Sequence, residues 1–77
     1  MNVKIYTTPT CMWCAREKAF FKQHQIPYQE VDVSRDEKAA EEMIGRSGQM
    51  GVPVTDINGT LIVGFDEPAL KKALKLK

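Results

Sequence analysis

Residues 3–14 read VKIYTTPTCMWC, and this stretch predicts a strand that turns directly into a helix. Its first part alternates and is rich in β-branched and aromatic side chains, which is typical of a strand. A turn with a proline follows, and Thr10 at its end is a suitable N-cap for a helix over residues 11–24. Both cysteines of the chain therefore fall in the first turn of that helix.

The middle of the chain predicts a second strand and a second helix. A proline interrupts the first helix, and residues 28–33 alternate again as a strand. Ser34, with Glu37 three residues later, forms the capping box that opens a helix. We expect this helix to end at Gly45, and residues 46–51, which contain two more glycines, to form a loop.

The last third of the chain predicts a hairpin and a final helix. Residues 52–57 and 60–63 form two strands joined by Asn58-Gly59, the strongest two-residue hairpin signal. Pro68 fits the first turn of the helix that follows. An apolar stripe runs along this helix and includes Ala69, Leu70, Ala73, Leu74 and Leu76.

These elements predict an α/β fold of the order βαβαββα, in a single domain over residues 1–77. The first βαβ unit requires parallel strands, whereas the hairpin requires an antiparallel pair. We therefore expect a mixed four-stranded sheet flanked by helices on both faces. A chain of 77 residues has no room for a second domain.

The composition excludes several classes of protein. A net charge of +1, from 11 basic and 10 acidic residues, provides no basic surface for nucleic acid. No apolar run approaches the roughly 20 residues that cross a bilayer, and the first residues do not resemble a signal peptide. Two cysteines are too few for a disulfide-rich secreted scaffold. We expect a cytoplasmic protein without nucleic-acid or membrane partners, where a close cysteine pair is catalytic or metal-binding.

The sequence motif that most clearly indicates chemical activity is Cys-x-x-Cys at residues 11–14. A spacing of three places both side chains on one face of a helix, close enough for a disulfide. Cys11 lies at the helix N-terminus, where unpaired N–H groups and the helix dipole favour the reactive thiolate. We therefore predict Cys11 as the nucleophile and Cys14, one turn deeper, as the resolving thiol that attacks a mixed disulfide.

Metal binding is the main alternative for this cysteine pair. A closed zinc site needs four ligands, and His24 lies about 15 Å along the helix from Cys14, beyond reach. Small ferredoxin-like carriers bind Cu(I) through a Cys-x-x-Cys after their first strand. They have a methionine where this chain has Pro9, and their elements follow a different order. We therefore predict no metal ligands, and a soft-metal carrier remains an alternative.

The whole chain resembles the glutaredoxin family of the thioredoxin fold. The resemblance rests on Cys-Met-Trp-Cys after the first strand, on Val52-Pro53, and on Gly64-Phe65-Asp66 after the hairpin. It implies that the Val52-Pro53 peptide bond is cis and lies beside the dithiol, where the backbone of Val52 pairs with a peptide-like substrate. It also implies thiol–disulfide oxidoreductase activity, with glutathione as a co-substrate and no tightly bound cofactor.

The resemblance further implies a binding groove beside the dithiol. Carried over by position, Phe65 and Asp66 hold the γ-glutamyl end of glutathione, and Trp13 replaces the usual tyrosine and covers the sulfur. Trp13 has a competing interpretation as an exposed aromatic without a task, and Asp66 has one as the N-cap of the last helix. The binding residues predicted in this way are Trp13, Gln49, Gly51, Val52, Pro53, Gly64, Phe65 and Asp66.

Two positions depart from the family pattern in a way that bears on glutathione. The lysine that many glutaredoxins carry three residues before the first cysteine is here Thr8. The arginine often found four residues before the proline is here Gln49. Each of these cations contributes about 1.5–3 kcal/mol through a charge-assisted bond to the glycine carboxylate of glutathione. Their loss weakens the expected affinity for glutathione.

The expected partners are disulfide-containing proteins, with glutathione or a thioredoxin reductase as the source of electrons, and we expect a monomer. Redoxins that serve ribonucleotide reductase look similar and are reduced by thioredoxin reductase, so that function is the first alternative. A glutathione-ligated iron–sulfur carrier of two chains is a further alternative. Family members of that kind usually have a single active cysteine, whereas this chain has two.

Overall fold

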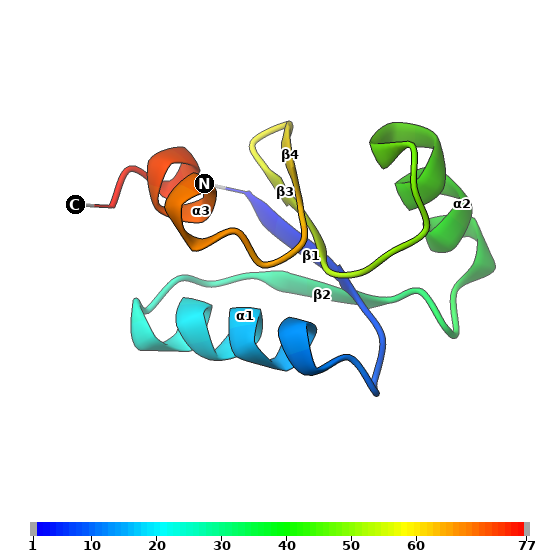
Figure 1. Ribbon diagram of the computed structural model, residues 1–77, viewed down its shortest axis with the longest axis horizontal. Helices are drawn as coiled ribbons and strands as arrows, with labels where there is room; N and C mark the ends of the chain where they lie inside the picture. The colour runs from blue at the N-terminus through cyan, green and yellow to red at the C-terminus, as the bar shows by residue number, and fades with distance from the viewer. Residues whose placement is uncertain (1, 77) are drawn as a thin grey trace.

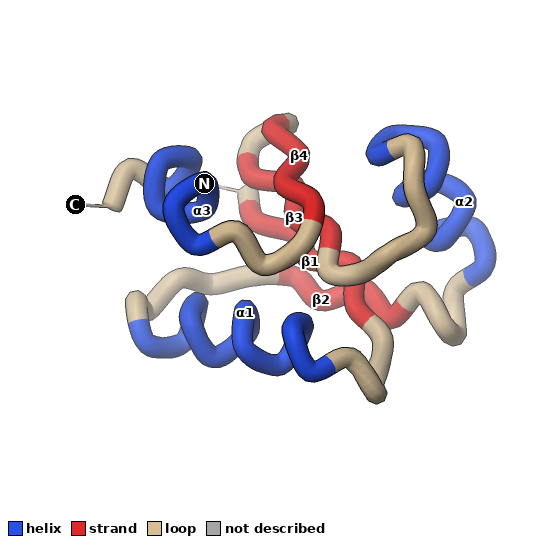
Figure 2. Tube along the Cα trace, in the orientation of Figure 1, coloured by secondary structure: helices blue, strands red, loops and turns tan. Residues whose placement is uncertain are grey.

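A computed structural model describes residues 2–76 and shows the predicted alternation of strands and helices (Figures 1 and 2). None of the helices described is long and apolar enough to cross a membrane. The elements are β1 (Val3–Thr7), α1 (Met12–Gln23), β2 (Gln29–Asp32), α2 (Glu37–Ser47), β3 (Val54–Ile57), β4 (Thr60–Val63) and α3 (Glu67–Leu74).

The four strands form one mixed sheet in the order β2-β1-β3-β4. β1 runs parallel to β2 and antiparallel to β3, and β3 runs antiparallel to β4. The central strand β1 is therefore paired on both sides, and its residue Ile5 lies between Glu30 of β2 and Thr55 of β3. The prediction of a mixed sheet, with a parallel first unit and an antiparallel hairpin, is confirmed.

Helices cover both faces of the sheet, as predicted. α1 and α3 lie on one side of the sheet and α2 on the other (Figure 1). Alternate residues of each strand point to opposite faces, so the sheet contributes to two cores. The larger core, shared with α1 and α3, contains Val3, Ile5, Phe20, Phe21, Ile57, Ile62, Leu70 and Leu74. The smaller core, shared with α2, contains Tyr6, Ala39, Met43 and Val54.

Two predicted helix boundaries are wrong, because a neighbouring residue competes for the capping role. Thr10 does not cap α1; the N-cap is Cys11, whose sulfur accepts the N–H of Cys14. Ser34 does not cap α2; the N-cap is Asp36. The N–H and hydroxyl of Ser34 instead donate to the carboxylate of Asp32, at 2.9 and 2.6 Å, which forms a local Asx turn.

Other element ends also shift from the prediction. α2 continues through Gly45 to Ser47 and ends at Gly48, which has the left-handed conformation at φ +75°. β2 is shorter at both ends than residues 28–33. β3 begins at Val54 instead of Val52, since Pro53 has no N–H to donate to a strand neighbour. The extended segment before β3 is part of the site described below.

The two glycines near the end of α2 give a test of this boundary. Gly48 has φ +75°, and an added Cβ would contact nothing within 4 Å, so Gly48→Ala is penalised only through the backbone conformation. We expect this variant to lower the free energy of unfolding by about 1 kcal/mol. Gly45→Ala, inside the helix and equally unobstructed, is expected to raise it by about 0.5–1 kcal/mol.

Urea denaturation of the three proteins measures both effects. Effects of the same sign at the two positions would contradict the helix end described here.

Candidate active site

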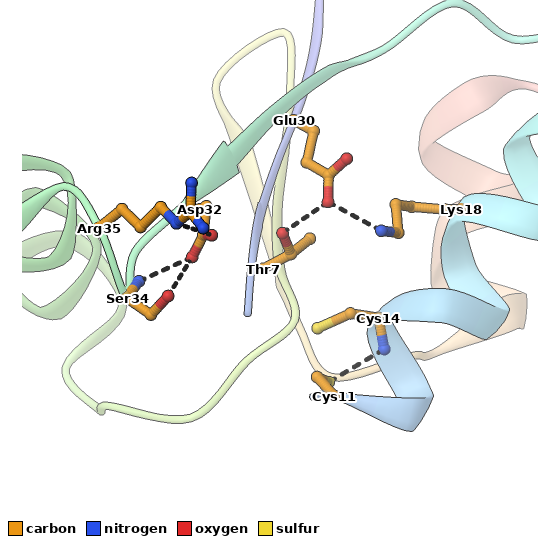
Figure 3. Close-up of polar contacts among 8 residues, drawn as sticks. All are labelled: Thr7, Cys11, Cys14, Lys18, Glu30, Asp32, Ser34 and Arg35. Atoms are coloured by element: carbon orange, nitrogen blue, oxygen red, sulfur yellow. Dashed lines mark hydrogen bonds and ion pairs between the residues drawn. The ribbon is translucent and has the colours of Figure 1, made fainter. Parts of the chain in front are cut away.

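Cys11 occupies the N-cap position of α1, with an extended backbone at φ −85° and ψ 113°. The N–H of Cys14 donates to the Cys11 sulfur at 3.0 Å, shown as a dashed line in Figure 3. The sulfur therefore receives one of the N–H groups that a helix start leaves unpaired, and it lies at the positive end of the helix dipole. This placement, half-exposed at the start of a helix, supports the role of Cys11 as the nucleophile.

Cys14 has the opposite environment, although it lies only one turn away. Its side chain is completely buried, and in Figure 3 its sulfur points from α1 toward the sheet. Burial, with a further contribution from the neighbouring Cys11 sulfur, raises the pKa of the Cys14 thiol far above its usual range. Both cysteines are reduced here. The structure thus pairs a half-exposed first thiol with a second thiol that stays protonated.

A groove begins next to Cys11 and runs along the segment before β3. The Cys11 sulfur lies 3.8 Å from the carbonyl oxygen of Val52, and the Val52-Pro53 peptide bond is cis. The N–H of Gly64, at the end of β4, donates to the carbonyl of Pro53 at 2.8 Å, which ties the two edges of the groove together. A hollow of about 240 Å³ lies here, lined by Trp13, Val52, Pro53, Gly64 and Phe65.

Aromatic side chains form the outer wall of this hollow. Trp13 is 49% exposed, and its ring centre lies 6.4 Å from that of Phe65. Phe65 also packs edge-on against Phe20 of α1, so its position is fixed by the larger core. The guanidinium of Arg16 lies 4.9 Å from the Trp13 ring centre, at cation–π distance. The groove therefore has a rigid apolar wall with one cation at its rim.

Five of the predicted binding residues line the hollow, and three do not. Gln49 is folded back on its own loop, where its amide donates to the carbonyl of Gly51 at 3.0 Å and accepts the N–H of Gly51. Asp66 is exposed and accepts the N–H of Ala69 at 3.2 Å as the N-cap of α3, in agreement with its second interpretation. Gln49, Gly51 and Asp66 therefore lie outside the lining.

One residue of the site was missed by reasoning from the sequence. Glu17 of α1 is fully buried, one turn after Cys14, and it accepts a hydrogen bond from the hydroxyl of Thr55 on β3. Burial raises the pKa of the Glu17 carboxyl to about 7, and the bond from Thr55 only partly opposes this. The sequence feature that could have identified Glu17 is its spacing from Cys14 and Phe21, which places all three residues on the buried stripe of one helix.

Lys18, the next residue, serves a different network. Its ammonium pairs with Glu30 of β2 at 2.8 Å, and Glu30 also accepts the hydroxyl of Thr7 at 2.8 Å (Figure 3). This network connects α1 to β1 and β2 beside the dithiol. Within residues 2–76, no three histidine, cysteine or acidic side chains are grouped so that they could hold a metal ion.

Comparison with known proteins supports the same kind of active site as this geometry. The sequence profile of the glutaredoxin family matches residues 3–62. The chain belongs to the glutaredoxin family. Glutaredoxins are thiol–disulfide oxidoreductases, and both cysteines of the dithiol are present in this one.

Individual relatives of this glutaredoxin cover nearly its whole length. A glutaredoxin-like 8.6 kDa protein from the rubredoxin operon of Clostridium pasteurianum is 44% identical over 73 residues, which is 95% of this chain and 97% of that protein. Glutaredoxin 3 of Escherichia coli is 39% identical over 66 residues, 86% of this chain and 80% of the relative.

Solved structures confirm the fold class. A mutant of the thioredoxin-like protein BC3987 superimposes with a TM-score of 0.93 at 26% identity, over 99% of this chain and 97% of that one. The predicted thioredoxin-like fold is therefore confirmed.

Proposed function

We propose that this glutaredoxin reduces protein disulfides and glutathione mixed disulfides by a two-cysteine mechanism. The observation that carries the proposal is the contrast between the two sulfurs. The Cys11 sulfur is half-exposed, receives the Cys14 N–H at 3.0 Å and adjoins the groove, whereas Cys14 is fully buried. Substrates therefore meet Cys11 first.

The reaction then has two steps. The Cys11 thiolate attacks one sulfur of the substrate disulfide, which breaks that bond and releases the other sulfur as a thiol. Cys14 next attacks the Cys11 sulfur of the mixed disulfide, and the substrate leaves reduced as a Cys11–Cys14 disulfide forms. An external thiol reductant restores the dithiol. No tightly bound cofactor takes part in this scheme.

The groove suits a peptide-like partner. The carbonyl oxygen of Val52 lies 3.8 Å from the Cys11 sulfur, where an extended substrate can add to the Val52 backbone as a strand adds to a sheet edge. Trp13 and Phe65 form an apolar wall along the same path. Both glutathione and an extended segment of a protein offer such a backbone, so we propose both as substrates, bound by a monomer in a reducing, cytoplasmic environment.

The source of electrons is tested by a coupled assay. Oxidised protein is supplied with NADPH and either glutathione plus glutathione reductase, or thioredoxin reductase alone, and the loss of NADPH absorbance is followed. We expect turnover with glutathione. Turnover only with thioredoxin reductase would place this chain with the redoxins that serve ribonucleotide reductase.

The arginine that many glutaredoxins carry at position 49, where this chain has glutamine, provides a second test of glutathione binding. We expect Gln49→Arg to lower the KM for glutathione about tenfold in a hydroxyethyl disulfide assay, since one charge-assisted bond contributes about 1.5 kcal/mol. The substitution replaces an amide now bonded to Gly51 with a guanidinium, which we expect to bind the glycine carboxylate.

Gln23→Arg is the matched control for this substitution. It adds the same charge at the exposed far end of α1, roughly 18 Å from the N-cap by helix rise. Equal KM values in the two arginine variants would contradict binding of the glycine carboxylate near residue 49.

A further inference from the structure

Glu17 is a buried carboxyl group that the two-step mechanism above does not use. Its side chain has no exposed surface, and its Oε1 atom has no hydrogen-bond partner among residues 2–76. A buried acceptor without a partner destabilises the folded protein. Such a group calls for an explanation, and a role in proton transfer is one.

Cys14 is the candidate proton donor, because the Glu17 carboxylate lies close enough to contribute to the raised pKa of the Cys14 thiol. Glu17 follows Cys14 by three residues on α1, and residues with this spacing lie next to each other on one helix face. Both side chains are completely buried on the side of α1 that faces the sheet. Neither group has access to bulk water, so a proton that leaves the Cys14 thiol needs an acceptor inside the protein.

The other polar groups around Glu17 are already engaged. Thr55 of β3 donates its hydroxyl to Oε2 and leaves Oε1 free. Lys18, the next residue on α1, is bound to Glu30 of β2, and that carboxylate also accepts from Thr7 of β1. α1 itself contributes one further titratable side chain on this face, Cys14.

We propose that Glu17 accepts the proton of Cys14 as this thiol attacks the mixed disulfide. The inference rests on the proposed two-step function and assigns the proton of its second step. The Glu17 carboxylate takes the proton from the Cys14 sulfur, and the Cys14 sulfur forms a bond to Cys11. The bond between Cys11 and the substrate sulfur breaks, and the substrate leaves with the electron pair as a thiolate.

Protons and electrons balance in this step. The Cys14 sulfur is oxidised from a thiol to a disulfide sulfur, the substrate sulfur is reduced, and the Cys11 sulfur only exchanges its disulfide partner. Glu17 becomes a neutral carboxylic acid. When the dithiol is restored by the external reductant, the proton returns to Cys14. A carboxyl with a pKa of about 7 suits this exchange, because it binds and releases a proton near neutral pH.

The second step can be observed separately from the first. Reduced protein in excess is mixed with dithiobis(nitrobenzoate) in a stopped-flow instrument. Attack by Cys11 releases one coloured thiolate, and attack by Cys14 on the resulting mixed disulfide releases another. For Glu17→Gln we expect an unchanged first phase and a second phase about 10²-fold slower at neutral pH, the lower range for general base catalysis.

The pH profile distinguishes proton transfer from a merely structural role. The second-phase rate of the wild type is expected to level off above pH 7, whereas that of Glu17→Gln continues to rise with pH. Thr55→Val removes the bond that favours the carboxylate, so we expect its profile to level off at a higher pH with the same maximum. Glu41→Gln, an exposed charge change on α2, is the control and should match the wild type.

Each outcome decides a separate claim. A second phase with the wild-type profile in Glu17→Gln, or one slowed by the same factor at every pH, would overturn the proton transfer to Glu17. Loss of the first phase in Cys11→Ser but not in Glu17→Gln supports the assignment of the nucleophile. Retention of that phase in Cys11→Ser would overturn the proposed function itself.

Discussion

Cys11→Ser is expected to lower disulfide reductase activity on the order of 10³-fold or more, because it removes the atom that attacks the substrate. A serine hydroxyl can still accept the N–H of Cys14 as a helix cap, so α1 keeps its start. Insulin reduction with a chemical reductant measures the activity, and circular dichroism checks the fold. A Cys11→Ser protein that retains activity would contradict the assignment of the nucleophile.

Cys14→Ser is the matched variant for this experiment, because it keeps the nucleophile and removes the resolving thiol. We expect it to stop after the first step and to accumulate a mixed disulfide with glutathione or a protein. Intact mass spectrometry detects this adduct as added mass on Cys11. Free enzyme after exposure to a disulfide substrate would show that the second sulfur is not needed to resolve the intermediate.

The stability of the reduced protein is expected to fall as the pH rises from about 4.5 to 7, because Glu17 must then ionise in a buried site. The folded protein holds the Glu17 proton up to a pKa of about 7, against the ordinary 4.5. Between these values the folded state binds more protons than the unfolded state, so its stability decreases with pH. One pKa unit corresponds to 1.36 kcal/mol, so Glu17 contributes a loss of about 3 kcal/mol.

Glu17→Gln removes this dependence while keeping an acceptor for Thr55. Urea denaturation at pH 5 and pH 7.5 gives the two free energies of unfolding for each protein, and the wild type is expected to lose about 2 kcal/mol more than the variant, because part of the loss has already occurred at pH 5. The carboxylates with lowered pKa values, such as Glu30 and Asp56, contribute stability that is lost only below this window. Equal changes in the two proteins would show that Glu17 titrates normally in the folded state.

The order of elements followed from the sequence because each boundary has a local chemical cause. The Asn58-Gly59 turn and Pro68 in the first turn of α3 act within a few residues, and both appear where predicted. Errors arose where two neighbours offered the same interaction. Ser34 donates its hydroxyl to Asp32, and Asp36 caps α2 in place of Ser34.

The residues of the site also fall into those that the sequence predicts and those that it does not. The dithiol and the five groove residues were predictable, because spacing and family resemblance place them along the chain. The position of the Gln49 side chain could not be predicted, because its amide makes two hydrogen bonds to the backbone of Gly51 in the same loop. Glu17 was missed because its hydrogen-bond partner Thr55 lies 38 residues later in the chain, and only the folded sheet brings the two together.

The sulfur that reacts is also the atom that caps α1. Formation of a disulfide changes the atom that accepts the N–H of Cys14, so the hydrogen bond that caps the first turn differs between the reduced and oxidised states. By thermodynamic linkage, an interaction that stabilises that turn more in the reduced state than in the oxidised state also stabilises the dithiol over the disulfide and makes the protein a weaker electron donor. Residues in the first turn can therefore tune reducing strength without touching a substrate.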